Sequence, residues 1–143
     1  MHLTSYTLFP LLNRKLRTTL EKLTESLFYG TWRSYKAFLQ SGNIINHTKE
    51  NYQEFTFTQE KQLTITAYDN GQRKMLDHAE DWMILFKDKR HYLSIDGKRL
   101  AYEVITINHT ALVLLHIQSR IKFFCALPET WDHYVNSAKS LVL

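Results

Sequence analysis

Three residue types that often dictate a fold are scarce in this sequence: cysteine, proline and glycine. Cys125 is the single cysteine among 143 residues, so no disulfide can form within the chain. This excludes the small secreted scaffolds that depend on disulfide bridges, and it allows a reducing compartment. Two prolines and four glycines are too few for a disordered chain or a repeat linker.

Long apolar runs and blocks of one charge are also missing. Nowhere do 18 or more apolar residues follow one another, so the sequence predicts no membrane-spanning helix. The net charge of +4 is mild and scattered, which argues against nucleic acid or an anionic membrane surface as a partner. The apolar patch within residues 1–12 has neither the positive n-region nor the small-residue cleavage site of a signal peptide. We therefore expect a soluble, cytoplasmic protein without stable membrane insertion, unless a leader has been removed.

What remains is the composition of one globular domain. Hydrophobic residues make up 44% of the chain and charged residues 22%, and a chain of this length buries about two-thirds of the surface that its unfolded form exposes. We predict a single domain over residues 1–143. It comprises an N-terminal helix over 11–28, a barrel over 30–127 and a C-terminal helix over 129–142.

Residues 11–28 carry apolar side chains at helical spacing. Leucines recur every three or four residues and so share one face; they are Leu12, Leu16, Leu20, Leu23 and Leu27. This amphipathic helix could bind a membrane surface or a partner, or it could cover the domain's own core. Its polar face mixes both signs of charge, which favours the core.

From residue 30 onward the hydrophobic period changes to two, which predicts strands. Residues 52–58 alternate clearly, with Phe55 and Phe57 on one face. Residues 73–78 fit a strand poorly, whereas the apolar run 82–86 predicts a strand that is buried on both faces.

Turn signals punctuate this region. Asn70-Gly71 and Asp96-Gly97 predict hairpins, because these residues tolerate the positive φ that tight turns require. The polar residues 40–51 predict a loop. The result is an antiparallel up-and-down meander of eight or nine short strands, which removes its exposed edges most simply by closing into a barrel. Residues 129–142 place Trp131 and Val135 on one helical face and predict a helix that packs on the barrel.

The junction between the first helix and the meander carries the motif Gly30-Thr31-Trp32. A glycine followed two residues later by tryptophan, at the start of the first strand, resembles the opening of the lipocalins. The order helix, meander, helix resembles the bacterial lipocalin-like domains of the calycin superfamily. The resemblance implies that Gly30 lets the chain turn into the barrel, that Trp32 fills its closed end, and that Arg120 stacks on the indole face. The Thr-Asp-Tyr turn of lipocalins, and the arginine just beyond their last strand, are not found at those positions.

Members of this family commonly hold a small apolar molecule inside the barrel. The resemblance therefore implies non-enzymatic binding of a small hydrophobic or amphipathic ligand. Residues of one parity face the interior of such a barrel, and the predicted ligand-binding residues are Phe55, Phe57, Ile65, Trp82, Tyr102 and Leu114. The same side chains could instead fill the barrel completely. The protein would then be a protein-interaction or dimerisation module, for example a homodimer.

Other site chemistry has little support in the sequence. The histidines lack H-x-x-x-H spacing, so we expect no metal and no cofactor. We expect His116, in an apolar strand, to be a satisfied core residue and Cys125 to be buried rather than nucleophilic. A catalytic residue is not predicted, although an enzyme that uses the cavity stays open as a third and weaker hypothesis. The acidic residues Asp77, Glu80 and Asp81 are expected to lie in a solvated loop.

Overall fold

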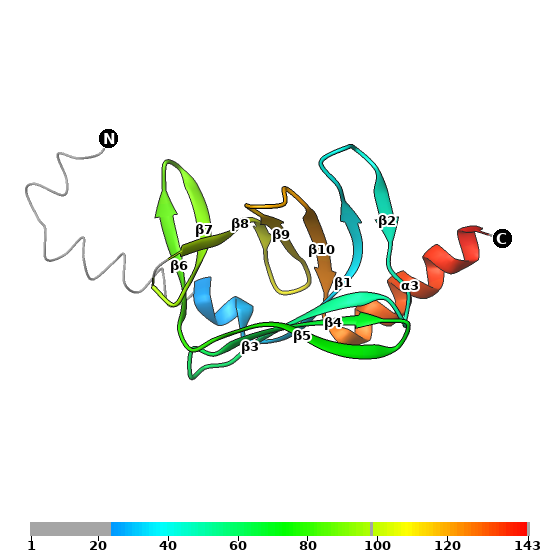
Figure 1. Ribbon diagram of the computed structural model, residues 1–143, viewed down its shortest axis with the longest axis horizontal. Coiled ribbons are helices and arrows are strands. Elements are labelled where there is room, and N and C mark those ends of the chain that lie inside the picture. The colour runs from blue at the N-terminus through cyan, green and yellow to red at the C-terminus, as the bar shows by residue number, and fades with distance from the viewer. Residues whose placement is uncertain (1–23, 98, 143) are drawn as a thin grey trace, which may run out of the picture.

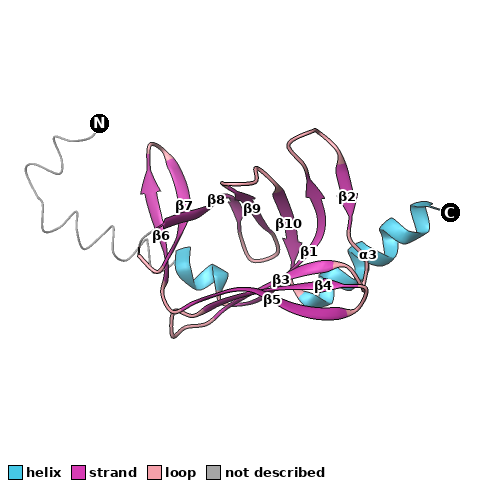
Figure 2. Cartoon of the chain, in the orientation of Figure 1, coloured by secondary structure: helices cyan, strands magenta, loops and turns pink. Residues whose placement is uncertain are grey.

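A computed structural model describes residues 24–97 and 99–142 of the chain. Strands make up most of it, and helices occur near its two ends (Figure 2). Residues 24–28 are helical, whereas residues 11–23 of the predicted N-terminal helix lie outside the described part. The strands and the second helix are β1 (Gly30–Phe38), β2 (Ile44–Asn46), β3 (Tyr52–Phe57), β4 (Leu63–Asp69), β5 (Gln72–Ala79), β6 (Trp82–Lys87), β7 (Arg90–Ile95), β8 (Arg99–Ile107), β9 (Leu112–His116), β10 (Lys122–Ala126) and α3 (Pro128–Val142).

All the strands belong to one antiparallel sheet with the order β5-β4-β3-β1-β10-β9-β8-β7-β6, and β2 pairs with β1 beside this path. The first and last long strands are neighbours, since Arg33 of β1 lies opposite Ala126 of β10. The sheet curls so that its two ends approach each other (Figure 1). The predicted fold class, an antiparallel meander whose first and last strands join, is confirmed.

One seam separates this sheet from a fully hydrogen-bonded barrel. The strands β5 and β6 follow each other in sequence, yet no ladder joins them in the described sheet, and they form its two edges. At the start of β6 the backbone N–H of Trp82 donates instead to the carbonyl oxygen of Lys61, at 3.2 Å. The molecule is therefore a curled half-barrel, and the closed ring that we predicted is interrupted between β5 and β6.

Two predicted hairpins form as expected. Asn70 and Gly71 have φ of 52° and 80°, and Asp69 pairs with Gln72 across the turn. Asp96 and Gly97 adopt φ of 56° and 64° at the β7–β8 turn. In the two-residue loop Asn70-Gly71, positive φ at both central positions is the geometry that matches the twist of paired strands.

Three local predictions are wrong. Residues 73–78, whose pattern fits a strand poorly, lie within β5, so Asp77 is in a strand and not in a loop. Residues 40–51 are not only a loop, because Ile44–Asn46 pairs with β1 as the short strand β2. The apolar run of β6 is not buried on both faces. Trp82 and Ile84 on one face are buried, whereas Met83 and Leu85 on the other face are 36% and 38% exposed, which is the alternation of a strand with one buried face.

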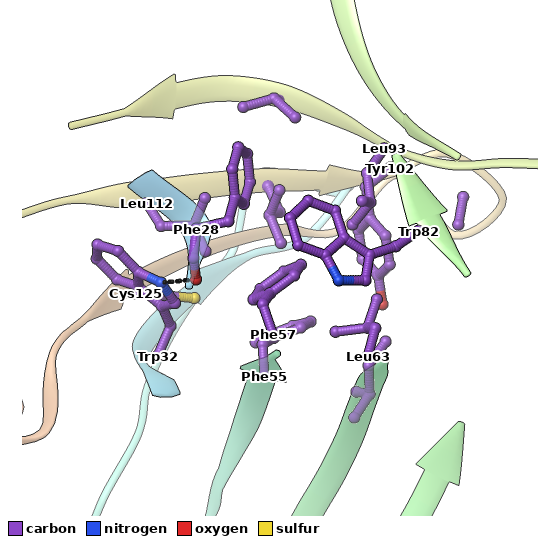
Figure 3. Packing of buried hydrophobic residues seen from close by; sticks show 14 of the residues in the cluster. Phe28, Trp32, Phe55, Phe57, Leu63, Trp82, Leu93, Tyr102, Leu112 and Cys125 are labelled. Atoms are coloured by element: carbon purple, nitrogen blue, oxygen red, sulfur yellow. Dashed lines mark hydrogen bonds between the residues drawn. The ribbon is translucent and has the colours of Figure 1, made fainter. Parts of the chain in front are cut away.

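The core lies on the inside of the curl, where aromatic side chains from opposite walls meet (Figure 3). A smaller cluster lies between the sheet and α3, and consists of Ala126, Trp131 and Val135 with Tyr35 and Tyr52 against it. The helix begins at Pro128, one residue before the predicted start. Proline suits this position because the first helical N–H groups have no partner within the helix.

Candidate functional site

The six predicted ligand-binding residues meet in one place. They come from the five strands β3, β4, β6, β8 and β9, and all belong to the same buried cluster. None is more than 6% exposed; the six are Phe55, Phe57, Ile65, Trp82, Tyr102 and Leu114. The parity predicted from the sequence therefore matches the face that turns inward.

Aromatic contacts organise this cluster into two groups. In one group the ring centroid of Phe57 lies 5.1 Å from that of Trp82 and 5.3 Å from that of Phe28. In the other, Phe55 lies 5.9 Å from Tyr102 and 6.0 Å from Phe123. The rings meet at steep angles, which is the edge-to-face arrangement that aromatic pairs prefer. Phe28 lies on the helical segment, as predicted, and also belongs to this cluster, which the sequence analysis did not predict.

Two titratable groups of the cluster are held in their neutral forms. Burial raises the pKa of the Tyr102 hydroxyl, with the charge of Asp77 adding to this effect. Burial alone raises the pKa of the Cys125 thiol. Both groups stay protonated near neutral pH, so Cys125 is a small hydrophobic side chain here rather than a ready nucleophile.

The Gly30-Thr31-Trp32 motif lies where the chain passes from the helical residues into β1. Gly30 has φ of +117°, a conformation that side-chain-bearing residues rarely adopt. Trp32 is 1% exposed, and its Nε1–H donates to the carbonyl oxygen of Phe28 at 3.0 Å (Figure 3). The indole therefore ties the end of the helical segment to the first strand.

The predicted stacking of Arg120 on Trp32 is wrong. Arg120 lies in the exposed turn between β9 and β10. The register pairs Phe38 with Lys122 at that end of β1, whereas Trp32 lies opposite Phe55 toward the other end. The length of the strand thus separates the guanidinium from the indole.

Cations do cover indole faces at two other places. The guanidinium carbon of Arg33 lies 5.1 Å from the ring centroid of Trp131, and Arg33 also pairs with Glu54 at 2.8 Å. This contact fastens α3 to the outside of the sheet. The ammonium of Lys61 lies 4.6 Å from the ring centroid of Trp82 at the seam.

The seam is fastened by a group that we call the Glu25 clasp, made of Glu25, Lys61 and the start of β6. The Glu25 carboxylate pairs with the Lys61 ammonium and accepts the backbone N–H of Ile84 at 3.5 Å. Since the helical residues 24–28 carry Glu25, the clasp joins them to the edge strand. Sequence reasoning missed it, because 36 residues separate the two charged partners.

The sequence analysis also did not predict a polar pair formed by Ser34 and His47. Ser34 Oγ lies 2.6 Å from His47 Nδ1 and accepts the backbone N–H of Gln53 at 2.9 Å. Ser34 is fully buried, and a carboxylate partner for His47 is not found among the described residues. The pair thus joins the segment after β2 to β1, and it lacks the accessible hydroxyl that a nucleophilic serine requires.

The other residues that the sequence analysis considered for site chemistry, His116 and Asp77, form hydrogen bonds or ion pairs with other protein side chains. His116 lies 2.7 Å from Ser119 Oγ within the β9–β10 turn, and burial lowers the pKa of its imidazole. Asp77 pairs with Arg99 at 2.7 Å. Within the described residues no three potential metal ligands gather, and none of the helices there is long and apolar enough to cross a membrane.

Comparison with known proteins shows a structural likeness. No family model matches the sequence, and neither does any curated protein. A lipocalin-like protein from Bacteroides uniformis, known from its crystal structure, has 11% sequence identity; the alignment covers 71% of this chain and 98% of that one, with a TM-score of 0.46. The half-barrel observed here is itself consistent with the lipocalin-like fold that Gly30-Thr31-Trp32 led us to predict.

Proposed function

We propose that this chain binds a small hydrophobic or amphipathic molecule inside the curled sheet and catalyses no reaction on it. The observation that supports this role is the convergence of side chains from five strands on one buried, aromatic-rich face. Binding sites for small molecules are mostly apolar, with few polar groups to fix the orientation of the ligand. The open seam between β5 and β6 adds a place where the wall can part without breaking a ladder.

A binding role suits this interior better than an enzymatic one. Acid–base chemistry needs titratable groups whose pKa values are poised near the working pH. Burial raises the pKa of both Tyr102 and Cys125, which keeps them protonated. The interior groups are therefore suited to contact a ligand rather than to exchange protons with it.

Titration with Nile red, an uncharged dye that fluoresces in apolar surroundings, tests this proposal. We expect one saturable site per chain and displacement of the dye by an acetylnaphthalene. Leu114→Phe enlarges a fully buried side chain and should weaken dye binding about tenfold or more, because the larger ring would occupy space that the bound dye needs.

The matched control is Ile105→Phe, at a position that is 42% exposed on β8. It should leave dye affinity unchanged. Dye binding that never saturates, or that both variants weaken equally, would contradict an interior site.

A second candidate function, self-association, is favoured by apolar side chains on the two edge strands. Met75 and Leu76 of β5 are 56% and 47% exposed, and Phe86 of β6 is 61% exposed. Exposed apolar edge strands readily pair with another chain. Sedimentation equilibrium distinguishes ligand binding from self-association. A stable dimer that Phe86→Lys dissociates supports an interaction module. A monomer that binds Nile red supports the ligand-binding proposal.

A further inference from the structure

Trp82 differs from the other two tryptophans in its hydrogen bonding. Trp32 Nε1–H donates to Phe28 O at 3.0 Å, and Trp131 Nε1–H donates to Ser34 O at 2.8 Å. Trp82 is 0% exposed, yet its Nε1–H has no hydrogen-bond partner within the described part of the chain. A buried donor without an acceptor is rare in folded proteins and calls for an explanation.

The protein groups around this indole offer only weak acceptors. The nearest rings are those of Phe57, Phe28 and Tyr29, at centroid distances of 5.1, 5.8 and 5.9 Å. Phe57 lies nearly perpendicular to the indole, at 77°, and an aromatic face is a second-order acceptor compared with an oxygen. The donor is thus available to an oxygen atom that the protein does not itself supply.

The electrostatic surroundings favour an uncharged partner. The Lys61 ammonium lies 4.6 Å from the centroid of the Trp82 ring. The charge of Lys61 is already neutralised by Glu25, whose side chain is only 12% exposed. A ligand carboxylate would have to be buried without a counter-ion of its own, which is costly, whereas a carbonyl oxygen would not.

The position of Trp82 also suits a residue that holds one end of a ligand. It is the first residue of β6, beside the seam where the sheet has no ladder. Its ring belongs to the same buried cluster as the other predicted ligand-binding residues (Figure 3). An apolar molecule inside the curl could therefore place one polar end at this indole while its remainder contacts the aromatic rings.

We propose that Trp82 Nε1–H is the hydrogen-bond donor that orients the ligand, and that the ligand is an uncharged, largely apolar compound bearing a carbonyl oxygen. This inference rests on the proposed binding function and specifies its chemistry. It assigns the one unpaired indole N–H of the described tryptophans to recognition rather than to packing.

The test compares an acetylnaphthalene with the ethylnaphthalene of the same substitution pattern, which has a similar shape and no oxygen. Both are titrated against the wild-type chain and against Trp82→Phe. We expect the affinity ratio of the acetyl to the ethyl compound to fall about five- to tenfold in Trp82→Phe, the loss of one hydrogen bond. Trp131→Phe removes an indole N–H outside the inner cluster and should leave the ratio unchanged.

The outcomes separate the two proposals. If neither naphthalene binds the wild-type chain and Nile red shows no saturable site, the binding function itself fails. If Nile red binds and neither naphthalene does, the binding function stands and the anchor is wrong. If both bind and the ratio is the same in wild type and Trp82→Phe, the binding function stands and the anchor is wrong.

A second readout avoids the risk that Trp82→Phe does not fold. In nitrogen–proton correlation spectra of the wild-type protein, the indole signal of Trp82 should move downfield with the acetyl compound and not with the ethyl compound. Equal shifts with both compounds, or no shift with either when both are bound, would overturn the assignment.

Discussion

Ser34 Oγ, in strand β1, makes two hydrogen-bond contacts. It accepts the backbone N–H of Gln53 and lies 2.6 Å from His47 Nδ1. Since Ser34 Oγ accepts the N–H of Gln53 with one lone pair, its own hydrogen is free to be donated to Nδ1 of a neutral imidazole. Burial lowers the pKa of His47, and a hydrogen bond with the backbone of Ser34, which raises it, offsets this only in part. The fold therefore keeps His47 neutral.

This arrangement predicts a loss of stability in acid. A histidine whose folded-state pKa lies below its unfolded value binds more protons when unfolded, so the free energy of unfolding falls as the pH drops below about 6.5. Urea denaturation between about pH 7.5 and 5.5 should show this fall, with a slope of at most about 1.4 kcal/mol per pH unit from His47.

Two variants identify the source of the effect. His47→Asn retains an acceptor for Ser34 but does not titrate, so its free energy of unfolding should depend less steeply on pH. His109→Asn, in an exposed turn, should reproduce the wild-type profile. Equal slopes for the wild type and His47→Asn would show that another group, such as His116, carries the acid sensitivity.

At the scale of strands and turns, the sequence predicted those turns whose conformation depends on their own residues. Asn70-Gly71 and Asp96-Gly97 form turns because they adopt positive φ at little cost. The short β2 was not predictable from its own residues, because Ile44 and Ile45 are exposed and the strand exists only through its pairing with β1. The apolar run of β6 was misread because a run of apolar residues does not show whether a second element will cover the outer face, where Met83 and Leu85 are exposed.

The Glu25 clasp is a contact between elements that predicts a local change in dynamics. Glu25→Ala removes the acceptor of the Ile84 N–H and the partner of Lys61, so we expect the Ile84 amide to exchange its hydrogen about fivefold faster. Amide exchange followed by nuclear magnetic resonance measures this rate residue by residue.

Glu50→Ala, at an exposed position outside the clasp, is the control and should leave the Ile84 amide unaffected. If exchange at Ile84 were unchanged in Glu25→Ala, the helical residues 24–28 would not hold the edge strand. The edge strand would then be held by the other contacts of Trp82, which include its backbone bond to Lys61 and its ring contact with Phe57.

Across the whole molecule, periodicity predicted which residues face inward but not how the sheet ends. Phe55, Phe57 and Ile65 lie in the buried cluster because alternation along a strand assigns each side chain to a face. The seam between β5 and β6 depends instead on where the curl brings distant strands together, and it joins Lys61 to Trp82 and Glu25 to Ile84. Such contacts across long stretches of sequence leave no periodic signal.

The account depends on a guest molecule lying on the inner face of the half-barrel. Nuclear Overhauser contacts between bound acetylnaphthalene and the methyl groups of the protein test this directly. We predict contacts with Leu114 and Ile65, which are buried in the cluster, and none with Ile105 or Met75, which are exposed. Contacts confined to Ile105 and Met75 would place the compound on the outside of the sheet and contradict the proposal.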